Sequence, residues 1–581
     1  MKKLLLAVFC LLSSVTVFAA QDLKANWEIV SVEGQNRTVT DNSNNNNPLA
    51  IVGGGSLEGN ATGNTLTVDN KNISIADQTA AQNAYAPSQT THGAYVAGGA
   101  ALNGLASQNT LNVKGGTLEG RDAYGGSAVL RDLQLRMEGG SADGNTVNID
   151  GVAVKEYSFT TTEGTSATIG GNVYGGYSEY AKGSANNNTV NITNNSVIDG
   201  DVYGGVVFDQ LTDEDLADIP GVLNSNASNN TVYVKDSTVK GTIAGAAGAS
   251  TTNNNKVVVE TSEVNTVLGV HANHGVHNSD QSATYANNNS VTVKNSEIVS
   301  AAAVNSLSIN ASGNSLTLDD SIFTGANGFV YSVNMGMAKA ADSGNPVLAN
   351  VGNNKLTLNK MSGTLTEIGG SLNLVGTSNG NTINIQNASD IELDNSVKLF
   401  MNGMLDSDTL STNQLLTLPD DKGLMFGGAS MYYSRQVGSG ESEPEAVEVA
   451  VAGTNSDNNN ILIQNSDFSG NIIGGFAAHI VEVDYEVITP NEEDPSKPTV
   501  ETVVKTGLTT NSTTVSWEKD EGGVWQQKTE NGEPQTAEKI DDMYSASNNT
   551  IVLDNTIFDG TIYGGYVYGA ELKEKNMHTK K

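Results

Sequence analysis

Charged side chains that could cleave a polysaccharide are the first residues to consider. Sugar hydrolysis needs a general acid and a general base whose neighbours tune their pKa values. Adjacent acids occur at Asp319-Asp320, Asp420-Asp421 and Asp541-Asp542, in turn-rich sequence where such pairs are typical of solvated corners. The chain has five arginines, none followed two residues later by Lys: Arg37, Arg121, Arg131, Arg136 and Arg435. We therefore expect no catalytic residue, and we keep polysaccharide cleavage as an alternative.

Nucleophiles and metal ligands give equally weak patterns. Ser343, in Ala341-Asp342-Ser343-Gly344-Asn345-Pro346, and Ser166, in Gly164-Thr165-Ser166-Ala167, only approach serine-protease motifs, and neither follows a convincing His and Asp motif. His271, His274 and His277 are spaced by three, but Gly275 favours a polar loop over a helical metal site. The sequence predicts no metal, no cofactor and no catalytic residue.

The elements that would carry any site are best seen in residues 186–205, which read NNNTVNITNNSVIDGDVYGG. Apolar Val190 and Ile192 alternate with polar residues, as in a short strand with one buried face. We expect Asn188, Asn195 and Gly200 to adopt positive φ between the strands. We expect the last strand, Val202 to Gly205, to end at a sharp corner.

Copies of this unit recur along the chain. Near-complete copies run over 109–126, 459–475 and 548–565, and partial copies start at Asn64, Asn145, Asn230, Asn255, Asn289, Asn314, Asn354 and Asn381. Short strands of this kind bury their apolar faces only when copies stack. The irregular spacing means that loops of different length are inserted between similar coils. The sequence predicts an all-β solenoid over residues 51–570.

Two residue types recur at fixed positions of the unit. Tyr124, Tyr174, Tyr203 and Tyr563 share a position that other copies fill with Ala244 and Ile473. A position that accepts Tyr, Ala or Ile indicates a structural stripe more than a row of sugar-stacking rings. The repeated asparagines predict amide ladders that satisfy hydrogen bonds between coils.

The two chain ends read differently from the repeats. Residues 1–20 have the basic start, apolar run and small-residue end of a secretory signal peptide. Cys10 lies inside it, so the exported protein lacks cysteine. We expect residues 21–50 to form a lead-in and cap, and 571–581 a charged tail. The formal net charge of −34 argues against a nucleic-acid partner.

Two excursions interrupt the repeats after Leu399. Residues 429–453 contain two alternating runs around a Gly- and Ser-rich segment, which predicts a protruding hairpin. Residues 477–545 contain a second excursion, with alternation over 480–487 and 499–504 and a further hairpin around 515–525. We expect both to be inserted β-hairpin arms on the solenoid.

The signal peptide, the Asn-Asn-x-Val-x-Ile units and the Val-Tyr-Gly-Gly units resemble the passenger regions of bacterial autotransporters over roughly residues 50–570. This resemblance implies a right-handed parallel β-helix displayed on the outer surface. That family also carries a C-terminal translocator barrel, with alternating strands of about ten residues. No stretch here fits it, so we expect a passenger without its barrel, export through a separate pore, or a likeness confined to the β-helix.

The resemblance implies a non-enzymatic adhesin or surface-display structure that is secreted or held at the cell surface or outer membrane. Its partners would be host cell surfaces, extracellular matrix or neighbouring bacterial cells. The alternatives are a polysaccharide-active lyase or hydrolase and a structural surface-layer or biofilm component. Loops on a rigid scaffold are where recognition usually lies, so the two arms are the expected contact regions.

Overall fold

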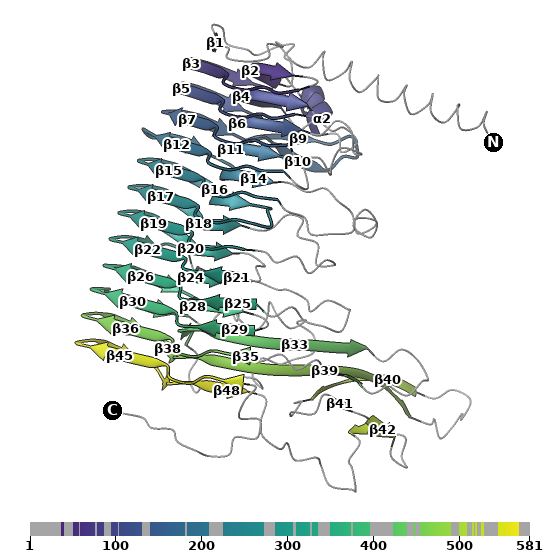
Figure 1. Cartoon of the computed structure of the whole chain (residues 1–581), viewed down its shortest axis with the longest axis vertical. Helices are drawn as coiled ribbons and strands as arrows, with labels where there is room; N and C mark the ends of the chain where they lie inside the picture. Colours follow the sequence, from purple (N-terminus) through teal and green to yellow (C-terminus); the bar gives the residue numbers. More distant parts are fainter. Residues whose placement is uncertain are drawn as a thin grey trace, which may run out of the picture. The chain divides into compact units, whose positions relative to one another are not determined.

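The computed structural model describes residues 36–39, 50–56, 59–75, 78–85, 94–102, 104–129, 140–179, 183–207, 225–271, 285–305, 310–325, 328–334, 349–373, 376–394, 422–437, 447–448, 454–489, 499–507, 514–515, 517–519, 525–527 and 544–568. The expected signal peptide, residues 1–20, and the tail, 571–581, lie outside these ranges. The described chain is nearly all β, in parallel ladders between successive coils, as in a β-solenoid (Figure 1).

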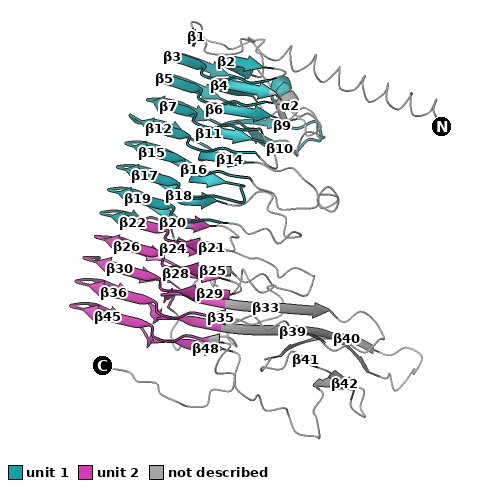
Figure 2. Ribbon diagram, viewed as in Figure 1, with its two compact units in different colours: residues 1–303, 318–322 teal, residues 304–317, 323–581 magenta. Residues whose placement is uncertain are grey.

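The chain divides into two compact units, residues 1–303 with 318–322 and residues 304–317 with 323–581 (Figure 2). Three strands contribute residues to both: β20 (Glu297–Asn305), β22 (Ser315–Asp319) and β23 (Ile322–Phe323).

Unit 1 is built from coils with up to three strands. The ladder asparagines are those whose side chains hydrogen-bond from coil to coil; in unit 1 they are Asn64, Asn109, Asn145, Asn188, Asn230, Asn255 and Asn289. The strands that follow them are β3 (Thr65–Ser74), β5 (Thr110–Glu119), β7 (Thr146–Asp150), β12 (Thr189–Thr193), β15 (Thr231–Lys235), β17 (Lys256–Glu260) and β19 (Ser290–Lys294). Later strands of the coils are β2 (Ala50–Ser56), β4 (Tyr95–Leu102), β6 (Asp122–Val129), β8 (Ala153–Lys155), β11 (Val173–Ser178), β13 (Val197–Ile198), β14 (Val202–Val207), β16 (Thr238–Ala247) and β18 (Glu263–His271). The first rung is β1 (Asn36–Val39), which pairs in parallel with β3.

Unit 2 repeats this plan. Its strands after the asparagines are β26 (Lys355–Asn359), β30 (Thr382–Gln386), β36 (Asn460–Gln464) and β45 (Thr550–Asp554). The second and third strands are β24 (Phe329–Asn334), β27 (Ser362–Leu365), β28 (Glu367–Asn373), β31 (Ile391–Leu393), β32 (Leu424–Phe426), β33 (Ala429–Val437), β37 (Asp467–Ser469), β38 (Asn471–Ile473), β39 (Phe476–Thr489), β46 (Ile557–Asp559), β47 (Ile562–Tyr563) and β48 (Tyr566–Tyr568). Short corner strands precede the asparagines: β21 (Asn310–Ser312), β25 (Ala349–Gly352), β29 (Gly376–Asn379), β35 (Thr454–Asn455) and β44 (Tyr544–Ser545).

Alternation sets the core of each coil. In β12, Val190 and Ile192 are buried and their polar neighbours are not, as predicted. Their partners in β7 and β15 have the same side chains or similar ones, so apolar residues stack on apolar residues from coil to coil. Such stacking buries the face that a single short strand leaves in water.

Two sequence expectations about turns are wrong. The positive φ lies at Asn187, Asn194 and Asn195, so the expectation is confirmed at Asn195 and wrong at Asn188 and Gly200. Asn187 makes the exposed left-handed turn, and this turns Asn188 inward to a fully buried position.

The Gly-Gly pair does not form a corner either, because β14 runs through Gly204 and Gly205 to Val207. A Cβ on Gly205 would lie 2.6 Å from Nδ2 of Asn230 and 2.2 Å from the carbonyl oxygen of Ala185. Glycine is needed here because an amide side chain and a backbone approach closely.

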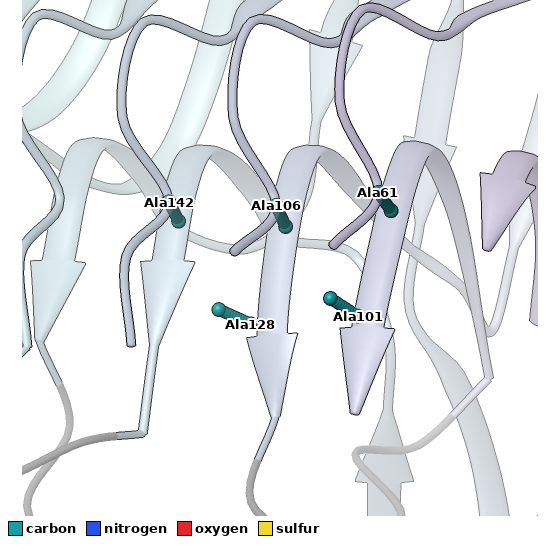
Figure 3. Close-up of a cluster of buried hydrophobic side chains, with 5 residues drawn as sticks. All are labelled: Ala61, Ala101, Ala106, Ala128 and Ala142. Carbon is teal, nitrogen blue, oxygen red and sulfur yellow. The ribbon is translucent and has the colours of Figure 1, made fainter. Parts of the chain in front are cut away.

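In unit 1, alanine fills the corner before most ladder asparagines. Ala61, Ala106 and Ala142 each stand three residues before one, and they cluster with Ala101 and Ala128 of β4 and β6 (Figure 3). Nδ2 of Asn109 donates to the carbonyl oxygen of Ala61 at 2.9 Å.

A small side structure interrupts the first coils of unit 1. The helix α2 (Gln78–Tyr85) contacts the antiparallel hairpin of β9 (Tyr157–Thr160) and β10 (Ser166–Ile169). In the part of the chain that is described, no helix is both long enough and apolar enough to cross a membrane.

Candidate functional site

The acid and base candidates lie in ordinary structural positions where the structure describes them. Asp319 ends β22, and Asp320 follows it as an exposed left-handed turn, so this pair occupies a coil corner. Asp420-Asp421 and Asp541-Asp542 lie outside the described residues. Arg121 is buried between β5 and β6 with 1% of its surface exposed. Arg131 and Arg136 lie outside the described residues.

The nucleophile and metal candidates are likewise separated or outside the described ranges. Ser166 is exposed in β10, opposite Thr160. Ser343, His274 and His277 are not among the described residues. Within those residues no group of three or more His, Cys, Asp or Glu side chains is placed to hold a metal ion. Of the three clustered histidines only His271 has a described environment, and its ring lies parallel to that of Tyr203.

The aromatic column is a stack of rings on the third strands of unit 1. The rings of Tyr124 and Tyr174 are stacked at 4.8 Å with an 8° angle between planes, and those of Tyr174 and Tyr203 at 5.6 Å and 12°. Tyr95 and Tyr177 pack edge-on against the Tyr124 ring. These tyrosines come from β4, β6, β11 and β14, which lie side by side in the stack (Figure 1).

Burial distinguishes a structural column from a sugar-binding surface. Tyr124 is 2% exposed and Tyr203 5% exposed, and their ring faces contact other rings. Offset and edge-on ring pairs contribute about 0.5–1.5 kcal/mol each beyond their burial. The geometry therefore favours the structural interpretation of this stripe.

Carboxylates lie beside the column and join it to the backbone. Tyr203 donates its hydroxyl to Oδ2 of Asp201 at 3.0 Å, while Oδ1 of Asp201 accepts the backbone N–H of Thr242 at 2.7 Å. Oδ1 of Asp122 accepts the backbone N–H of Asn172 at 2.9 Å, and Asn172 accepts that of Asp201 through its own Oδ1. These side chains form a second polar ladder along the third strands.

The electrostatics keep these phenols protonated. Burial, and then the charge of Asp122, raises the pKa of Tyr124 well above its ordinary value. Burial raises the pKa of Tyr203 as well, with the nearby Asp201 adding to the effect. Nδ1 of His271 lies 3.4 Å from the Tyr203 hydroxyl, and the two rings are parallel at 6.3 Å. The column thus supplies hydrogen-bond donors to carboxylates rather than a nucleophile or base.

The second candidate is the arm of unit 2, formed by β33, β39 and β40 (Thr499–Gly507). Strand β39 begins inside the coil, where residues 476–478 pair in parallel with β48. The whole strand has fourteen residues, of which 481–489 pair antiparallel with β40. β33 pairs with β39 in parallel over nine residues, 429–437 with 476–484. The arm is therefore continuous with the coil ladder.

The pairing differs from the expected hairpin at 429–453. β33 pairs with β39, and β34 (Val447–Glu448) pairs antiparallel with β41 (Thr514–Val515) of the other excursion. The alternating pattern correctly predicted two strands in residues 429–453, but each of them pairs with a strand that is distant in the sequence. Within the second excursion, β42 (Trp517–Lys519) and β43 (Trp525–Gln527) pair antiparallel as a hairpin.

Sequence reasoning missed the carboxylate ladder and the role of alanine. An Asp or Asn two residues before the repeated Tyr marks Asp122, Asn172 and Asp201, and an Ala three residues before the ladder asparagine marks the corner. Both signals were readable from the aligned repeats. Comparison of the chain with protein-family models, with curated proteins and with solved structures found no match.

Proposed function

We propose that this protein is an exported, non-enzymatic bacterial adhesin or surface-display structure, a right-handed β-helix whose arm makes the contact with its partner. The partner is a host cell surface, the extracellular matrix or a neighbouring bacterial cell. Loops and hairpins held on a rigid scaffold are the usual place for recognition.

The observation that carries the proposal is the continuity of β39 from coil to arm. Residues 476–478 belong to the coil ladder, and residues 481–489 form the hairpin with β40. Backbone pairing therefore fixes the direction in which the hairpin leaves the coil. A strand that is anchored in this way presents its far end with little conformational entropy left to lose on binding.

The test is adherence of beads coated with the protein to cultured epithelial cells, to matrix proteins and to bacteria. The control beads carry an equally acidic protein, because charge alone can alter adhesion. Saturable binding above the control supports the proposal. Folded protein that leaves the beads unbound on every surface contradicts it, and release of sugar ends from an acidic polysaccharide would favour the enzymatic alternative.

A further inference from the structure

Three consecutive asparagines at one corner of unit 1 have different roles. Oδ1 of Asn186 accepts the backbone N–H of Ser228 at 2.7 Å, and Nδ2 of Asn188 donates to Oδ1 of Asn230 at 3.0 Å. Asn187 lies between them, exposed, with φ at 57°. The left-handed turn therefore leaves one amide side chain at the surface, while its two neighbours bond to the next coil.

The same exposed turn recurs in the three coils that follow. Asn229, Asn254 and Asn288 have φ values of 60°, 57° and 56°, and all three are exposed. The backbone N–H of Asn229 donates to the carbonyl oxygen of Asn253 at 2.9 Å, which ties this turn to the next coil. Together with Asn187 these residues form a row of amides, one per coil, about 4.8 Å apart.

Three of these four turns are followed by a hydroxyl side chain at a fixed place. The sequences are Asn187-Asn188-Thr189, Asn229-Asn230-Thr231 and Asn288-Asn289-Ser290. The hydroxyl belongs in each case to the first residue of a strand, β12, β15 or β19, and that residue is partly exposed. An exposed Asn with Ser or Thr two residues later, and no Pro between, is the acceptor for attachment of a sugar to the amide.

The fourth turn is built in the same way but lacks the hydroxyl. Asn254 is exposed in the left-handed conformation like the others, and Lys256 is the first residue of the strand that follows. Asn353 of unit 2, with φ at 56°, is likewise exposed and is followed by Lys355. These two turns therefore match the acceptor turns in conformation and exposure, and differ in the chemistry of one side chain.

A further Asn-x-Ser sequence, at Asn194, is placed differently. Nδ2 of Asn194 donates to Oδ1 of Asp150 in the neighbouring coil, and the Ser196 hydroxyl donates to the carbonyl oxygen of Thr193 at 2.6 Å. Both the amide nitrogen and the hydroxyl are thus engaged within the coil. Among the described residues, no such side-chain hydrogen bond holds the amide of Asn187, Asn229 or Asn288.

We propose that Asn187, Asn229 and Asn288 are sites of covalent N-glycosylation, to which a transferase of the producing cell attaches a hexose from a nucleoside-diphosphate sugar. A bond forms between Nδ2 of the asparagine and C1 of the hexose, and the bond from C1 to the diphosphate oxygen breaks. The nucleoside diphosphate leaves, and one amide proton passes to a base of the transferase.

The spacing of the turns favours a single sugar over a branched oligosaccharide. Asn187 and Asn229 lie on adjacent coils, about 4.8 Å apart along the stack, so larger glycans on both would collide. Single hexoses along this corner add polar bulk without adding charge to an acidic surface. The sites lie on the coils of unit 1, so a failure of the arm to bind a partner leaves them unaffected.

The experiment maps sugars on the full chain purified from the cells that produce it. Peptides are fragmented in a mass spectrometer under conditions that keep the sugar on its side chain. We expect the added mass of one hexose on Asn187, Asn229 and Asn288, and none on Asn254 or Asn194. A lipid-linked donor would instead transfer an oligosaccharide, and that result contradicts the nucleotide-sugar donor.

Two substitutions test the hydroxyl in opposite directions. Thr231→Val keeps a β-branched residue in the strand and should abolish the hexose on Asn229, whereas Thr231→Ser should retain it. Lys256→Thr should make Asn254 an acceptor, because it supplies the hydroxyl at a turn that already has the conformation. Circular dichroism confirms that each variant is folded.

Three results overturn the proposal. The first is a chain from its own cells that carries no hexose at any of the three asparagines. The second is equal occupancy of Asn254 or Asn194 and of Asn229, since exposure and the hydroxyl would then not select the site. The third is a folded Thr231→Val variant that still carries the sugar on Asn229.

Discussion

Asn145 donates two hydrogen bonds to one atom, Oδ1 of Asn188: its backbone N–H at 2.9 Å and its side-chain Nδ2 at 3.1 Å. Asn188 donates the same pair to Oδ1 of Asn230, at 2.9 and 3.0 Å. The ladder runs in one direction through unit 1, and each side chain satisfies two donors of the coil before it. Buried backbone and amide groups at this corner depend on it.

Replacing Asn188 with Ala should therefore lower the free energy of unfolding by about 2–4 kcal/mol, because it leaves two buried donors of Asn145 unpaired. Urea unfolding followed by circular dichroism measures this loss. Asn187→Gly is the control: Asn187 is exposed at positive φ, which glycine also adopts, so this variant should change stability by less than about 0.5 kcal/mol. Equal effects of the two substitutions would refute a stabilising ladder.

Gly474→Ala should destabilise unit 2 by about 1–3 kcal/mol or more, since its Cβ would collide with the Gly564 carbonyl oxygen. Gly564→Ala places the same methyl group in open space at the same position of the next coil. Its unfolding midpoint should match that of the wild type. If Gly474→Ala proved equally harmless, close coil packing at this position would be disproved.

Alkaline solution should unfold the protein through its buried tyrosines. Burial raises the pKa values of Tyr124, Tyr177 and Tyr331 above 10.0 in the folded state, so only the unfolded chain ionises as pH passes that value. Their contribution to stability is present below pH 10 and is lost as pH rises toward the folded pKa values, by about 1.4 kcal/mol per pH unit and per tyrosine.

Urea titrations at several pH values, with phenolate absorbance recorded in parallel, check this expectation. Tyr124→Phe should make the alkaline loss of stability shallower, because phenylalanine cannot ionise. Tyr285→Phe is the control, since the Tyr285 side chain is 41% exposed and its phenol is accessible in the folded state. Phenolate absorbance that rises fully before the sheet unfolds would show that the column is accessible to solvent.

Removing the arm should abolish adherence and leave the coils folded. Replacing residues 485–541 with a short Gly-Ser linker retains the pairing of β33 with residues 476–484 and the restart at β44. Bead binding should fall to the level of the acidic control protein, with an unchanged urea midpoint for the coils. Deleting residues 209–223, which follow β14 in the sequence, should leave binding intact. Unimpaired adherence of the armless protein would locate the contact elsewhere.

The periodic pattern of side chains was sufficient to predict the strands and the ladder that each repeat forms. The alternation of Val190 and Ile192, and the asparagine repeats, led directly to stacked parallel strands and an amide ladder. Gly204 and Gly205 were predicted at a corner because glycine is common in turns. In the structure they lie in a strand, and glycine is needed there because the buried Asn230 side chain leaves no room for a Cβ. The partner of Val447 could not be predicted, since a two-residue strand can pair with many others.

The separation along the chain between ladder asparagines has no effect on the rung itself. Asn230 and Asn255 are 25 residues apart in the chain, and Asn459 and Asn549 are 90 apart. In both pairs the hydrogen bond from Nδ2 of the first side chain to Oδ1 of the second measures 3.0 Å. The entropy of closing a flexible segment grows only with the logarithm of its length, so the longer connection costs about 1 kcal/mol more. Whole surface modules can thus be gained or lost during evolution without any change to the coils that hold them.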